Sequence, residues 1–421
     1  MIIACRDYNP VDYFLRVLLP FLPTVSLMSS EYANLLRKAD LCVKCGQCLS
    51  SCPTYLLQGN EVESPRGRIS LIQGLFKGTL DESDPALRGH LDHCLGCGNC
   101  ESSCPSGVDY LNLLDQARAT KKLGAVPAWQ LQFFSQRRLL KASVTSSQFL
   151  PKSALKLLPD ILFQAQLSKP AGKPEFVDFG RFPTKEPVGR VALFVGCVGS
   201  LIDASAINLT RQLLVHFGYE VIIPETQTCC GALHRHEGYA GKADGYLHQN
   251  LDCFNGLELH QVLYFASGCG AQLHQFEKKF TAPIMEVTAF MAGIKAIETF
   301  RVNNTDKIVL HSPCSLRYQT QAWPKMRQLL QSMLGDQLTE LPENDLCCGS
   351  AGLHQLKYPD IASSLLKPKL DALASLTPDI LLTANTGCAM HFAKGIEKSS
   401  LPVKVMHPAE WIAGLFLKSG N

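Results

Sequence analysis

Hydrophobic positions in the second half of the chain form short continuous runs that close on Gly, Ser or Pro and are followed at once by a cysteine. Continuous apolar runs of this length are typical of strands buried on both faces of a parallel sheet. Between them, residues 206–217 and 325–334 have the spacing of amphipathic helices. The runs are 191–196, 262–268, 307–313 and 380–387. The pattern predicts α/β units with cysteines just beyond the carboxyl ends of the strands, where open parallel sheets place their ligands.

The first half of the chain has helical spacing instead. Ser64 and Asp84 each precede a proline, and each pair leads into apolar residues three and four positions apart. A capping side chain followed by proline is a typical helix start. Arg66 and Arg68, at the first of these starts, could lend positive charge to a nearby metal site, but they are expected to be solvated, as most arginines are. The sequence therefore predicts an α-helical domain before the α/β units.

The segment from residue 106 to residue 169 is helical in pattern and basic, with nine Lys or Arg against three acidic residues. A basic amphipathic stretch can bind an anionic membrane surface or dock on a partner subunit. It can equally be a helical layer with an ordinary charged outer face. Residues 169–189 then contain seven Pro or Gly residues and predict a linker at a domain boundary.

Composition narrows the class of protein. The chain has 421 residues, 46% of them apolar, and a net charge of only +3, which gives no reason to expect nucleic-acid binding. No apolar run reaches the ~18 residues that a membrane span needs. Met28 is followed by a good helix start, so residues 1–30 are interpreted as a disordered leader or a non-native start. Sixteen of the eighteen cysteines fall in metal-ligand patterns, and Cys5 and Cys253 fit none. Such patterns within a large protein indicate a reducing cytoplasm.

Eight of these cysteines form two copies of C-x2-C-x2-C-x3-C-P, with every gap preserved. Two such motifs are the signature of two [4Fe-4S] clusters, and in two-cluster ferredoxins the fourth cysteine of each motif binds the other cluster. Zinc would favour separate C-x2-C pairs, and disulfides do not suit a reducing compartment. The expected ligands are Cys42, Cys45, Cys48 and Cys104 for cluster 1, and Cys94, Cys97, Cys100 and Cys52 for cluster 2.

The second half is an internal duplication, with corresponding cysteines 117 to 119 residues apart. The sets are Cys197, Cys229, Cys230 and Cys269, and Cys314, Cys347, Cys348 and Cys388. Four thiolates in each repeat can hold a further iron-sulfur cluster or a zinc ion, and both interpretations stay open. Four histidines recur near these sites. His234, His311 and His354 are expected to be ordinary packed or surface side chains, and His391 is a candidate ligand.

With these motifs and repeats, the chain resembles a known family, the iron-sulfur subunits of bacterial glycolate oxidase. The resemblance covers residues from about 31 to the C-terminus. It rests on the two cluster motifs, on the two Cys-Cys-Gly repeats, and on local strings. These strings are Cys52-Pro-Thr-Tyr55, Ser64-Pro-Arg-Gly-Arg68, Cys104-Pro-Ser-Gly107, Ala266-Ser-Gly-Cys-Gly270, Cys347-Cys-Gly-Ser-Ala-Gly352 and Thr383-Ala-Asn-Thr-Gly-Cys388.

The resemblance implies a membrane-associated complex in which FAD-containing partner subunits oxidise glycolate to glyoxylate while this chain passes electrons to an acceptor such as quinone. It implies a cytoplasmic protein, peripheral on the inner face of the cytoplasmic membrane. The chain has no G-x-G-x-x-G loop on a strand-to-helix turn, so it is not expected to be catalytic alone. Related complexes that oxidise D-lactate or glycerol 3-phosphate are the alternative.

The repeats are also similar to the catalytic subunit of heterodisulfide reductases, which makes a thiol or disulfide reductase a further alternative. In that family the motif ends in C-x2-C, whereas Gln272 and His391 stand at the second cysteine positions here. The expected organisation is therefore a leader, an α-helical ferredoxin-type domain, a basic segment with its linker, and two Cys-Cys-Gly (CCG) repeats with parallel sheets. The predicted boundaries are 1–30, 31–125, 126–188, 189–305 and 306–421.

Overall fold

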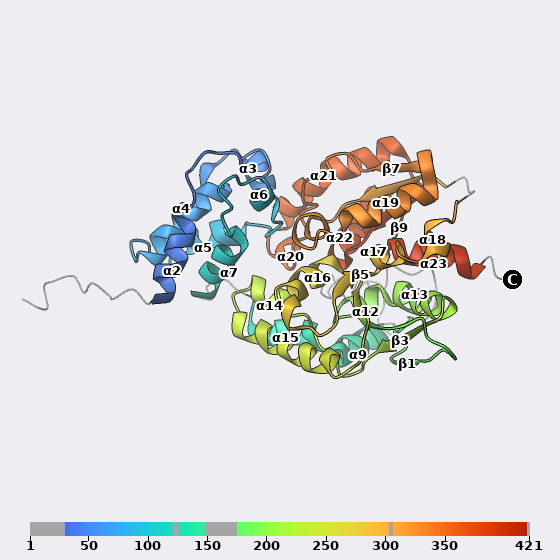
Figure 1. The fold of residues 1–421 in the computed structure, drawn as a ribbon. Helices are drawn as coiled ribbons and strands as arrows, with labels where there is room; N and C mark the ends of the chain where they lie inside the picture. The colour runs from blue at the N-terminus through green and yellow to red at the C-terminus, as the bar shows by residue number, and fades with distance from the viewer. Residues whose placement is uncertain (1–29, 121–125, 148–174, 303–305, 419–421) are drawn as a thin grey trace, which may run out of the picture.

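The computed structural model describes residues 30–120, 126–147, 175–302 and 306–418. Figure 1 shows a small all-helical domain at one end of the molecule and two α/β units at the other. The fold class predicted from the sequence, a helical domain followed by a duplicated parallel-sheet unit, is confirmed. The predicted leader lies outside the described residues, except for Ser30, where the first described helix begins.

The helical domain starts its helices where the capping pattern predicted. Ser64 Oγ accepts a hydrogen bond from the Gly67 N–H at 2.9 Å, and Asp84 Oδ1 accepts one from the Ala86 N–H at 2.8 Å. The elements are α2 (Ser30–Ala39), α3 (Pro53–Gln58), η2 (Glu61–Glu63), α4 (Pro65–Phe76), α5 (Pro85–Asp92), α6 (Asn99–Ser102) and α7 (Tyr110–Thr120). Apolar residues of α2, α4, α5 and α7 meet in one core, which fixes the loops that carry the cysteines.

The basic segment contains α8 (Ala128–Ser135) and α9 (Arg137–Ser147). Both are held against the first α/β unit. Arg137 Nη2 donates to the carbonyl oxygens of Glu225 and Gln227 at 2.6 and 2.7 Å. Phe134 and Leu140 are buried in a small cluster with Met390 of the second unit. The inner face of this segment is therefore a packed helical layer, which is one of the two interpretations of the sequence.

Each α/β unit is built on its own sheet. The first has the order β1-β3-β2-β4-β5 and the second the order β7-β6-β8-β9. All strand pairs are parallel except β1 with β3, which is antiparallel. The strand β1 lies within the stretch that was expected to be a linker. The strands are β1 (Gly180–Phe182), β2 (Gly189–Phe194), β3 (Tyr219–Ile223), β4 (Gln261–Tyr264), β5 (Ile284–Glu286), β6 (Ile308–His311), β7 (Leu338–Glu340), β8 (Ile380–Thr383) and β9 (Lys404–Met406).

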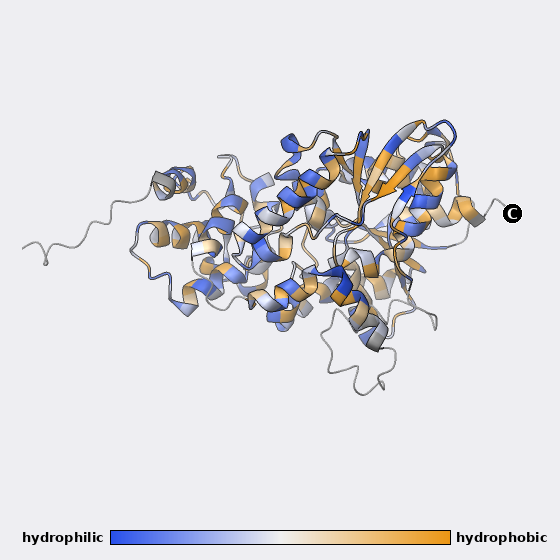
Figure 2. Ribbon diagram, turned by 90° about the horizontal axis from the view of Figure 1, so that it is seen from below, coloured by the Kyte–Doolittle hydropathy of each residue, from blue (hydrophilic) through white to orange (hydrophobic). Residues whose placement is uncertain are grey.

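Helices cover both faces of both sheets, which is why the strands read as continuous apolar runs. Alternate residues of β2 belong to different cores: Val191 and Leu193 to the large core between the sheets, Ala192 and Phe194 to an outer one. In Figure 2 the strands are largely orange, the colour of hydrophobic residues. The inner layer has α13 (Ala204–His216), α17 (Val287–Met291), α19 (Trp323–Leu334) and α23 (Pro408–Lys418), and the outer layers have α15 (Ala240–Asn255), α21 (Pro359–Leu376) and α22 (Thr386–Lys398).

Short elements complete the connections after the strands. They are α12 (Gly199–Ile202), α14 (Ala232–His236), α16 (Ser267–His274), η3 (Glu277–Lys279), α18 (Lys295–Glu298), η4 (Ser315–Gln319), η5 (Gly335–Gln337) and α20 (His354–Lys357). Among the described residues, no helix combines the length and the apolar character needed to cross a bilayer.

Helix packing and ion pairs are among the contacts that hold the three units together. The last helix, α23, packs on α13 of the first α/β unit, so the C-terminal segment of one repeat completes the core of the other. Lys357 Nζ, at the end of α20, contacts Asp92 of the helical domain and Glu237 of the first α/β unit, both at 3.1 Å. A single ammonium group therefore joins carboxylates from two other parts of the chain.

Candidate iron-sulfur centres

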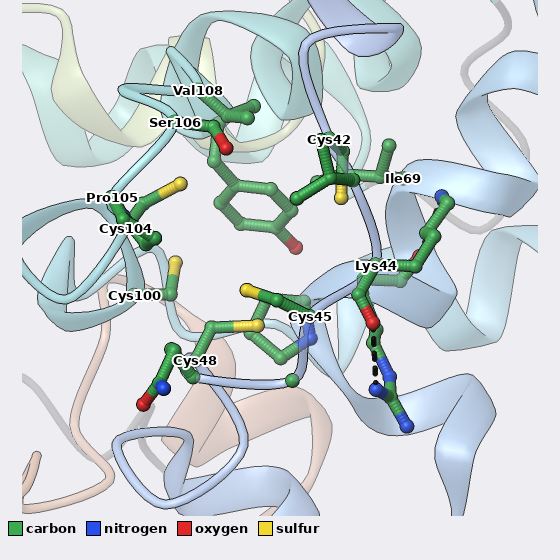
Figure 3. Close-up of a pocket in the computed structure, with 16 residues that line it drawn as sticks. Cys42, Lys44, Cys45, Cys48, Ile69, Cys100, Cys104, Pro105, Ser106 and Val108 are labelled. Atoms are coloured by element: carbon green, nitrogen blue, oxygen red, sulfur yellow. Dashed lines mark hydrogen bonds between the residues drawn. The ribbon is translucent and has the colours of Figure 1, made fainter.

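The first three cysteines of the first motif and Cys104 line one cavity in the helical domain (Figure 3). Cys42, Cys45 and Cys48 come from the loop between α2 and α3, and Cys104 comes from the loop after α6. Ile69, Val108 and Tyr110 are among the residues that form the rest of its wall. Four sulfurs around a largely apolar wall are the donor set that a [4Fe-4S] cluster requires.

The loop that carries these cysteines is fixed by its backbone and by α4. Gly46 has a φ of 88° and Lys44 a φ of 57°, so the loop makes two left-handed turns within three residues. Lys44 Nζ donates to Ser70 Oγ at 2.9 Å, and Arg66 Nη1 donates to the Lys44 carbonyl oxygen at 3.0 Å. Val43, at the outer edge of the loop, is 70% exposed, and Cys45 is exposed as well. The first site therefore opens to the surface.

The first three cysteines of the second motif, Cys94, Cys97 and Cys100, line a neighbouring cavity together with Cys52. Cys100, Tyr110 and Pro65 belong to the walls of both cavities. Tyr110 Oη donates to Cys94 Sγ at 3.4 Å. Burial raises the pKa of the Cys97 and Cys100 thiols, so both would be protonated without a bound cation. That the fourth cysteine of each motif binds the cluster of the other motif stays a prediction. It requires Cys104 in the wall of the first cavity and Cys52 in the wall of the second, which is where these residues lie.

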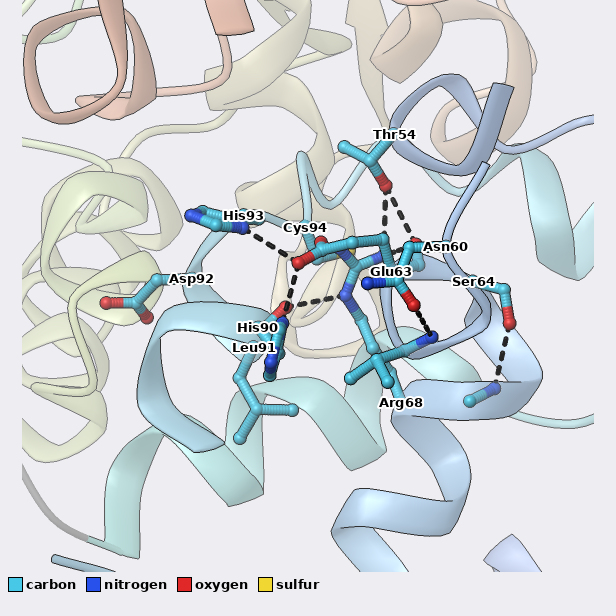
Figure 4. A network of polar contacts seen from close by, with 12 residues as sticks. Thr54, Asn60, Glu63, Ser64, Arg68, His90, Leu91, Asp92, His93 and Cys94 are labelled. Atoms are coloured by element: carbon cyan, nitrogen blue, oxygen red, sulfur yellow. Dashed lines mark hydrogen bonds and ion pairs between the residues drawn. The ribbon is translucent and has the colours of Figure 1, made fainter. Parts of the chain in front are cut away.

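A buried ion pair supports the second cavity (Figure 4). Arg68 is 1% exposed, so its interpretation as a solvated arginine was wrong. Its guanidinium donates to Thr54 Oγ1 at 3.0 Å, to the His90 carbonyl oxygen at 2.7 Å and to the Glu63 carboxylate. The sequence could not indicate this, because Arg68 meets His90 only when α5 packs beside α4. Arg66, two residues earlier, is partly exposed and pairs with Glu61.

The Glu63 carboxylate is shared between three donors. Besides Arg68, His90 Nδ1 and His93 Nδ1 lie 2.7 and 2.9 Å from Glu63 Oε1. Burial alone would raise the pKa of Glu63, but hydrogen bonds from His93 and His90, with the charge of Arg68, outweigh it and lower the pKa to about 2. The carboxylate is therefore ionised, and it compensates the buried Arg68 cation.

The cysteines of the CCG repeats follow the strands as predicted. Cys197 comes after β2, the Cys229-Cys230 pair after β3, and Cys269 in the first turn of α16 after β4. Cys197 Sγ and Cys229 Sγ are 3.3 Å apart. The glycine of the motif is required: Gly231 has a φ of 86°, and a Cβ there would lie 2.8 Å from Ala243 backbone atoms. Loop and helix thus approach closely and aim the thiols at one point.

The second repeat has the same construction. Cys314 Sγ and Cys347 Sγ are 3.9 Å apart, and Cys348 Sγ and Cys388 Sγ are 3.3 Å apart. Gly349 has a φ of 89°, and a Cβ there would lie 2.7 Å from the Ala362 carbonyl oxygen. Adjacent thiolates at these separations would repel one another, and a metal cation removes that cost. The donor set therefore fits a metal centre in each repeat.

All eight cysteines of the two repeats line a single cavity of about 1480 Å³, its open mouth included. The sequence predicted two sets of four but not that they face each other, because that relation depends on how the repeats pack. The helical domain closes one side of the cavity with Leu95, Gly96 and Arg118.

The second cysteine cavity of the helical domain adjoins the CCG cavity. Leu95 belongs to both walls, and the sulfur of Cys314 helps to raise the pKa of Cys97. Gln319 Nε2, in η4, donates to the Gly96 carbonyl oxygen at 3.0 Å, and Asn99 Nδ2 donates to the Asp345 carbonyl oxygen at 3.2 Å. The sites thus form a connected series, from the exposed loop at Cys45 to the interior of the duplicated unit.

The histidines near the repeats are buried, as packed side chains. His391 Nε2 bonds the Ala362 carbonyl oxygen at 3.2 Å, and its role as a ligand stays a prediction. Among the described residues, His311 is the histidine that groups with Cys348 and Cys388, with donor atoms within 4.8 Å of one another. His311 was expected to be an ordinary histidine, and its position three residues before Cys314 was the signal available. Gln272 lies in the cavity wall and its Oε1 accepts from Arg235 at 3.2 Å.

Comparison with known proteins agrees with this arrangement. The model of the 4Fe-4S dicluster domain matches residues 38–108, and that of the cysteine-rich domain matches residues 191–274 and 308–393. The probable glycolate oxidase iron-sulfur subunit of Bacillus subtilis (strain 168) is 30% identical over 94% of this chain and 97% of its own. The glycolate oxidase iron-sulfur subunit of Escherichia coli (strain K12) is 32% identical over 84% of this chain and 89% of its own.

A more distant relative is one of the subunits of the fumarate reductase (CoM/CoB) of Methanothermobacter marburgensis, 26% identical over 89% of this chain and 72% of its own. The matched families confirm that the protein binds iron-sulfur clusters and that it is an electron-transfer subunit of the oxidoreductase type. Both glycolate oxidase relatives are at least 30% identical to this chain and cover more than two thirds of it. The chain belongs to the family of glycolate oxidase iron-sulfur subunits.

Proposed function

We propose that this chain is the electron-transfer subunit of a complex that oxidises glycolate to glyoxylate, and that it receives electrons from FAD-containing partner subunits. The names of the relatives that match over almost the whole chain support glycolate as the substrate. The observation that carries the proposal is the connected series of cysteine sites, which begins at an exposed loop and ends in the cavity between the two CCG repeats. Such a series suits single-electron relay between a surface partner and an interior centre.

The ligand assignment is part of this proposal. Cluster 1 would be held by Cys42, Cys45, Cys48 and Cys104, and cluster 2 by Cys94, Cys97, Cys100 and Cys52. Support comes from the two cavities, each of which contains one of these sets in its wall. When bound, the clusters would supply one-electron redox chemistry, and Cys100 and Tyr110, which line both cavities, would separate them by little more than side chains.

The direction of transfer follows from exposure. The first site lies behind Val43 and Cys45 at the surface, whereas Cys97 of the second site lies beside Cys314 of the CCG cavity. We infer that a flavoprotein subunit docks over the first site and that electrons then move toward the repeats. Gly46 and Lys44 would hold the exposed loop in shape during that contact, since α4 anchors it through hydrogen bonds.

The acceptor and the location are proposed from the basic segment. On α8 and α9, Trp129 is 72% exposed, and Arg138, Leu139 and Lys141 are exposed as well. Aromatic, basic and aliphatic side chains on one stretch suit the headgroup region of an anionic membrane. The protein would then lie on the inner face of the cytoplasmic membrane and deliver electrons to quinone. Binding of the protein to vesicles with 30% anionic lipid tests this proposal. The double variant Arg138→Gln, Lys141→Gln should bind these vesicles less tightly.

A second candidate is a thiol or disulfide reductase that works in the CCG cavity. The observation in its favour is that eight cysteines surround one cavity open to solvent. Turnover of a disulfide by the isolated chain with a reduced dye would support this candidate, and glycolate-dependent reduction of the clusters in a flavoprotein complex would support the first.

The deciding experiment is anaerobic reconstitution with the co-purified flavoprotein subunits. Glycolate should reduce the flavin and then produce the EPR signals of reduced clusters in this chain, whereas the chain alone should not respond. D-lactate and glycerol 3-phosphate, tested in parallel, are the substrates of the alternative complexes. Faster cluster reduction with either of them than with glycolate would assign a different substrate, and no cluster reduction with any of them would contradict the relay.

A further inference from the structure

The two CCG repeats differ at one position beside their cysteines. In the first repeat Phe194 of β2 pairs with Tyr264 of β4, and in the second repeat His311 of β6 pairs with Thr383 of β8. The two pairs occupy equivalent positions. In each pair the first residue lies three residues before the first cysteine of its repeat, and the second residue lies five residues before the last cysteine. Where the first repeat has two aromatic side chains, the second therefore has an imidazole and a hydroxyl.

The imidazole of His311 is held in a fixed position. It is 1% exposed, its Nδ1 lies 2.9 Å from Thr383 Oγ1, and its ring lies edge-on to Phe392, with centroids 4.8 Å apart. A ring nitrogen of His311 and the sulfurs of Cys348 and Cys388 lie within 4.8 Å of one another, and all three residues are buried. Phe194, which is also buried, offers no donor atom at the corresponding place.

We propose that the metal centre of the second repeat has a mixed ligand set, in which an imidazole nitrogen of His311 binds beside the thiolates of Cys348 and Cys388. The first repeat would have sulfur ligands only. Metal-bound histidines usually donate their other ring N–H to a neighbouring oxygen, which fixes the tautomer. With Nδ1–H donating to Thr383 Oγ1, Nε2 keeps its lone pair for the metal. Thiolate with imidazole is a donor set that both zinc and iron accept.

A second difference between the repeats concerns charge. The close contact of Gly231 with Ala243 corresponds to that of Gly349 with Ala362, which aligns the two helices. Seven residues further along, α15 has the neutral Asn250 and α21 has Lys369. Lys369 is 1% exposed, and its Nζ donates to the Glu343 carbonyl oxygen at 2.8 Å.

Lys369 interacts electrostatically with Cys348 and Cys347, so the second repeat has a buried cation near its thiolates. An isolated buried ammonium is costly, and the thiolates of a metal centre would compensate it. In the first repeat, Asn250 instead bonds the backbone of the cysteine loop, through the Thr228 N–H and the Cys229 carbonyl oxygen. The second centre would therefore have the lower net negative charge, both from a neutral ligand and from a neighbouring cation.

His391 is the matched control for this proposal. It is buried in the same repeat and lies three residues after Cys388, but among the described residues it does not belong to the group of donor atoms within 4.8 Å that His311 forms with Cys348 and Cys388. His311→Phe introduces the residue that the first repeat has at this position, and His391→Phe makes the same chemical change at the control position. Thr383→Val keeps His311 and removes only its hydrogen-bond partner, so it remains informative if His311→Phe folds poorly.

The experiment uses the full chain, purified anaerobically after growth with ¹⁵N-labelled histidine. Iron and zinc per chain are measured first. If the repeats hold paramagnetic iron, pulsed EPR should detect a histidine nitrogen coupled to it. If they hold zinc, zinc-edge X-ray absorption should show nitrogen at about 2.0–2.1 Å as well as sulfur at about 2.3 Å. The nitrogen signal should disappear in His311→Phe and remain in His391→Phe, and Thr383→Val should lower the metal affinity roughly 10- to 100-fold while keeping the signal.

Several results would overturn the mixed ligand set: a metal centre with sulfur ligands alone, a nitrogen signal that survives His311→Phe, or loss of the signal in His391→Phe. Absence of any metal beyond the two clusters of the helical domain would also overturn it. The inference rests on metal binding by the repeats, as proposed above. Its failure is distinguishable from failure of the electron-transfer proposal, because glycolate-dependent reduction in the complex is measured separately and does not depend on which atoms bind the metal.

Discussion

Replacing Arg68 by methionine tests how the helical domain stabilises its second cluster. The change keeps most of the side-chain volume but removes the guanidinium, which bonds Thr54, Glu63 and the His90 carbonyl oxygen. Both members of the Arg68–Glu63 pair are 1% exposed, so solvent cannot replace the lost partner. Removing one member of a buried ion pair costs about 3–5 kcal/mol. His90 and His93 still donate to Glu63, so we expect the lower half of that range.

The matched control is Arg66→Met, the same chemical change two residues earlier on α4. Arg66 pairs with Glu61 at the surface, with side chains 29% and 48% exposed. A surface pair of this kind contributes far less to stability than a buried pair, because solvent screens the charges. Unfolding by guanidinium chloride under anaerobic conditions, with the clusters present, should therefore separate the two variants by about 2 kcal/mol or more in free energy of unfolding.

The same two variants should also differ in redox behaviour. Arg68 interacts electrostatically with Cys94 and Cys52, and Arg66 with Cys48. Loss of a nearby cation disfavours the more negative, reduced cluster, so Arg68→Met should lower the midpoint potential of the second cluster and leave the first nearly unchanged. EPR-monitored redox titration measures both. Equal stability of the two variants, or an equal shift of both clusters in Arg68→Met, would refute the reasoning.

Three further predictions concern the relay, the interface and the pH dependence. Cys45→Ser should abolish the EPR signal of one cluster and the electron transfer of the complex, while substrate still reduces the flavin; loss of flavin reduction would count against the assigned role. Lys357→Met should cost about 1–3 kcal/mol, because Asp92 and Glu237 lose a shared donor, and should speed limited proteolysis between the units. Burial lowers the pKa of His407 to about 4, so the unfolded chain binds the proton first, and stability should fall as pH drops from about 6.5 to about 4. His407→Gln should flatten that part of the denaturation profile, and an unchanged slope would contradict the assignment.

Features that depend on neighbouring residues could be predicted from the sequence. The proline-led starts of α4 and α5, and the strands before Cys197 and Cys314, follow from capping and from continuous apolar runs, which are local properties. Features that depend on packing could not. Arg68 looks like any arginine at a helix start until α5 supplies the His90 carbonyl oxygen.

The same limit applies to the site. The spacing of the eight CCG cysteines indicates two sets of ligands, but only the packing of the repeats brings both sets to one cavity. His311 lies within a strand run and was not distinguished from a packed histidine until β8 placed Thr383 beside it. Likewise β1 forms in a Pro- and Gly-rich stretch because β3 offers it an open edge, which the sequence of the stretch does not reveal.

The packing of α23 on α13 has a consequence for biosynthesis. The helix α13 ends at His216, and α23 begins at Pro408, about 190 residues later. A ribosome that has made the whole first repeat has therefore not yet made the helix that covers one of its apolar surfaces. The nascent first repeat would expose that surface during translation and would depend on chaperones, and expression of this repeat as a separate fragment should give aggregated material.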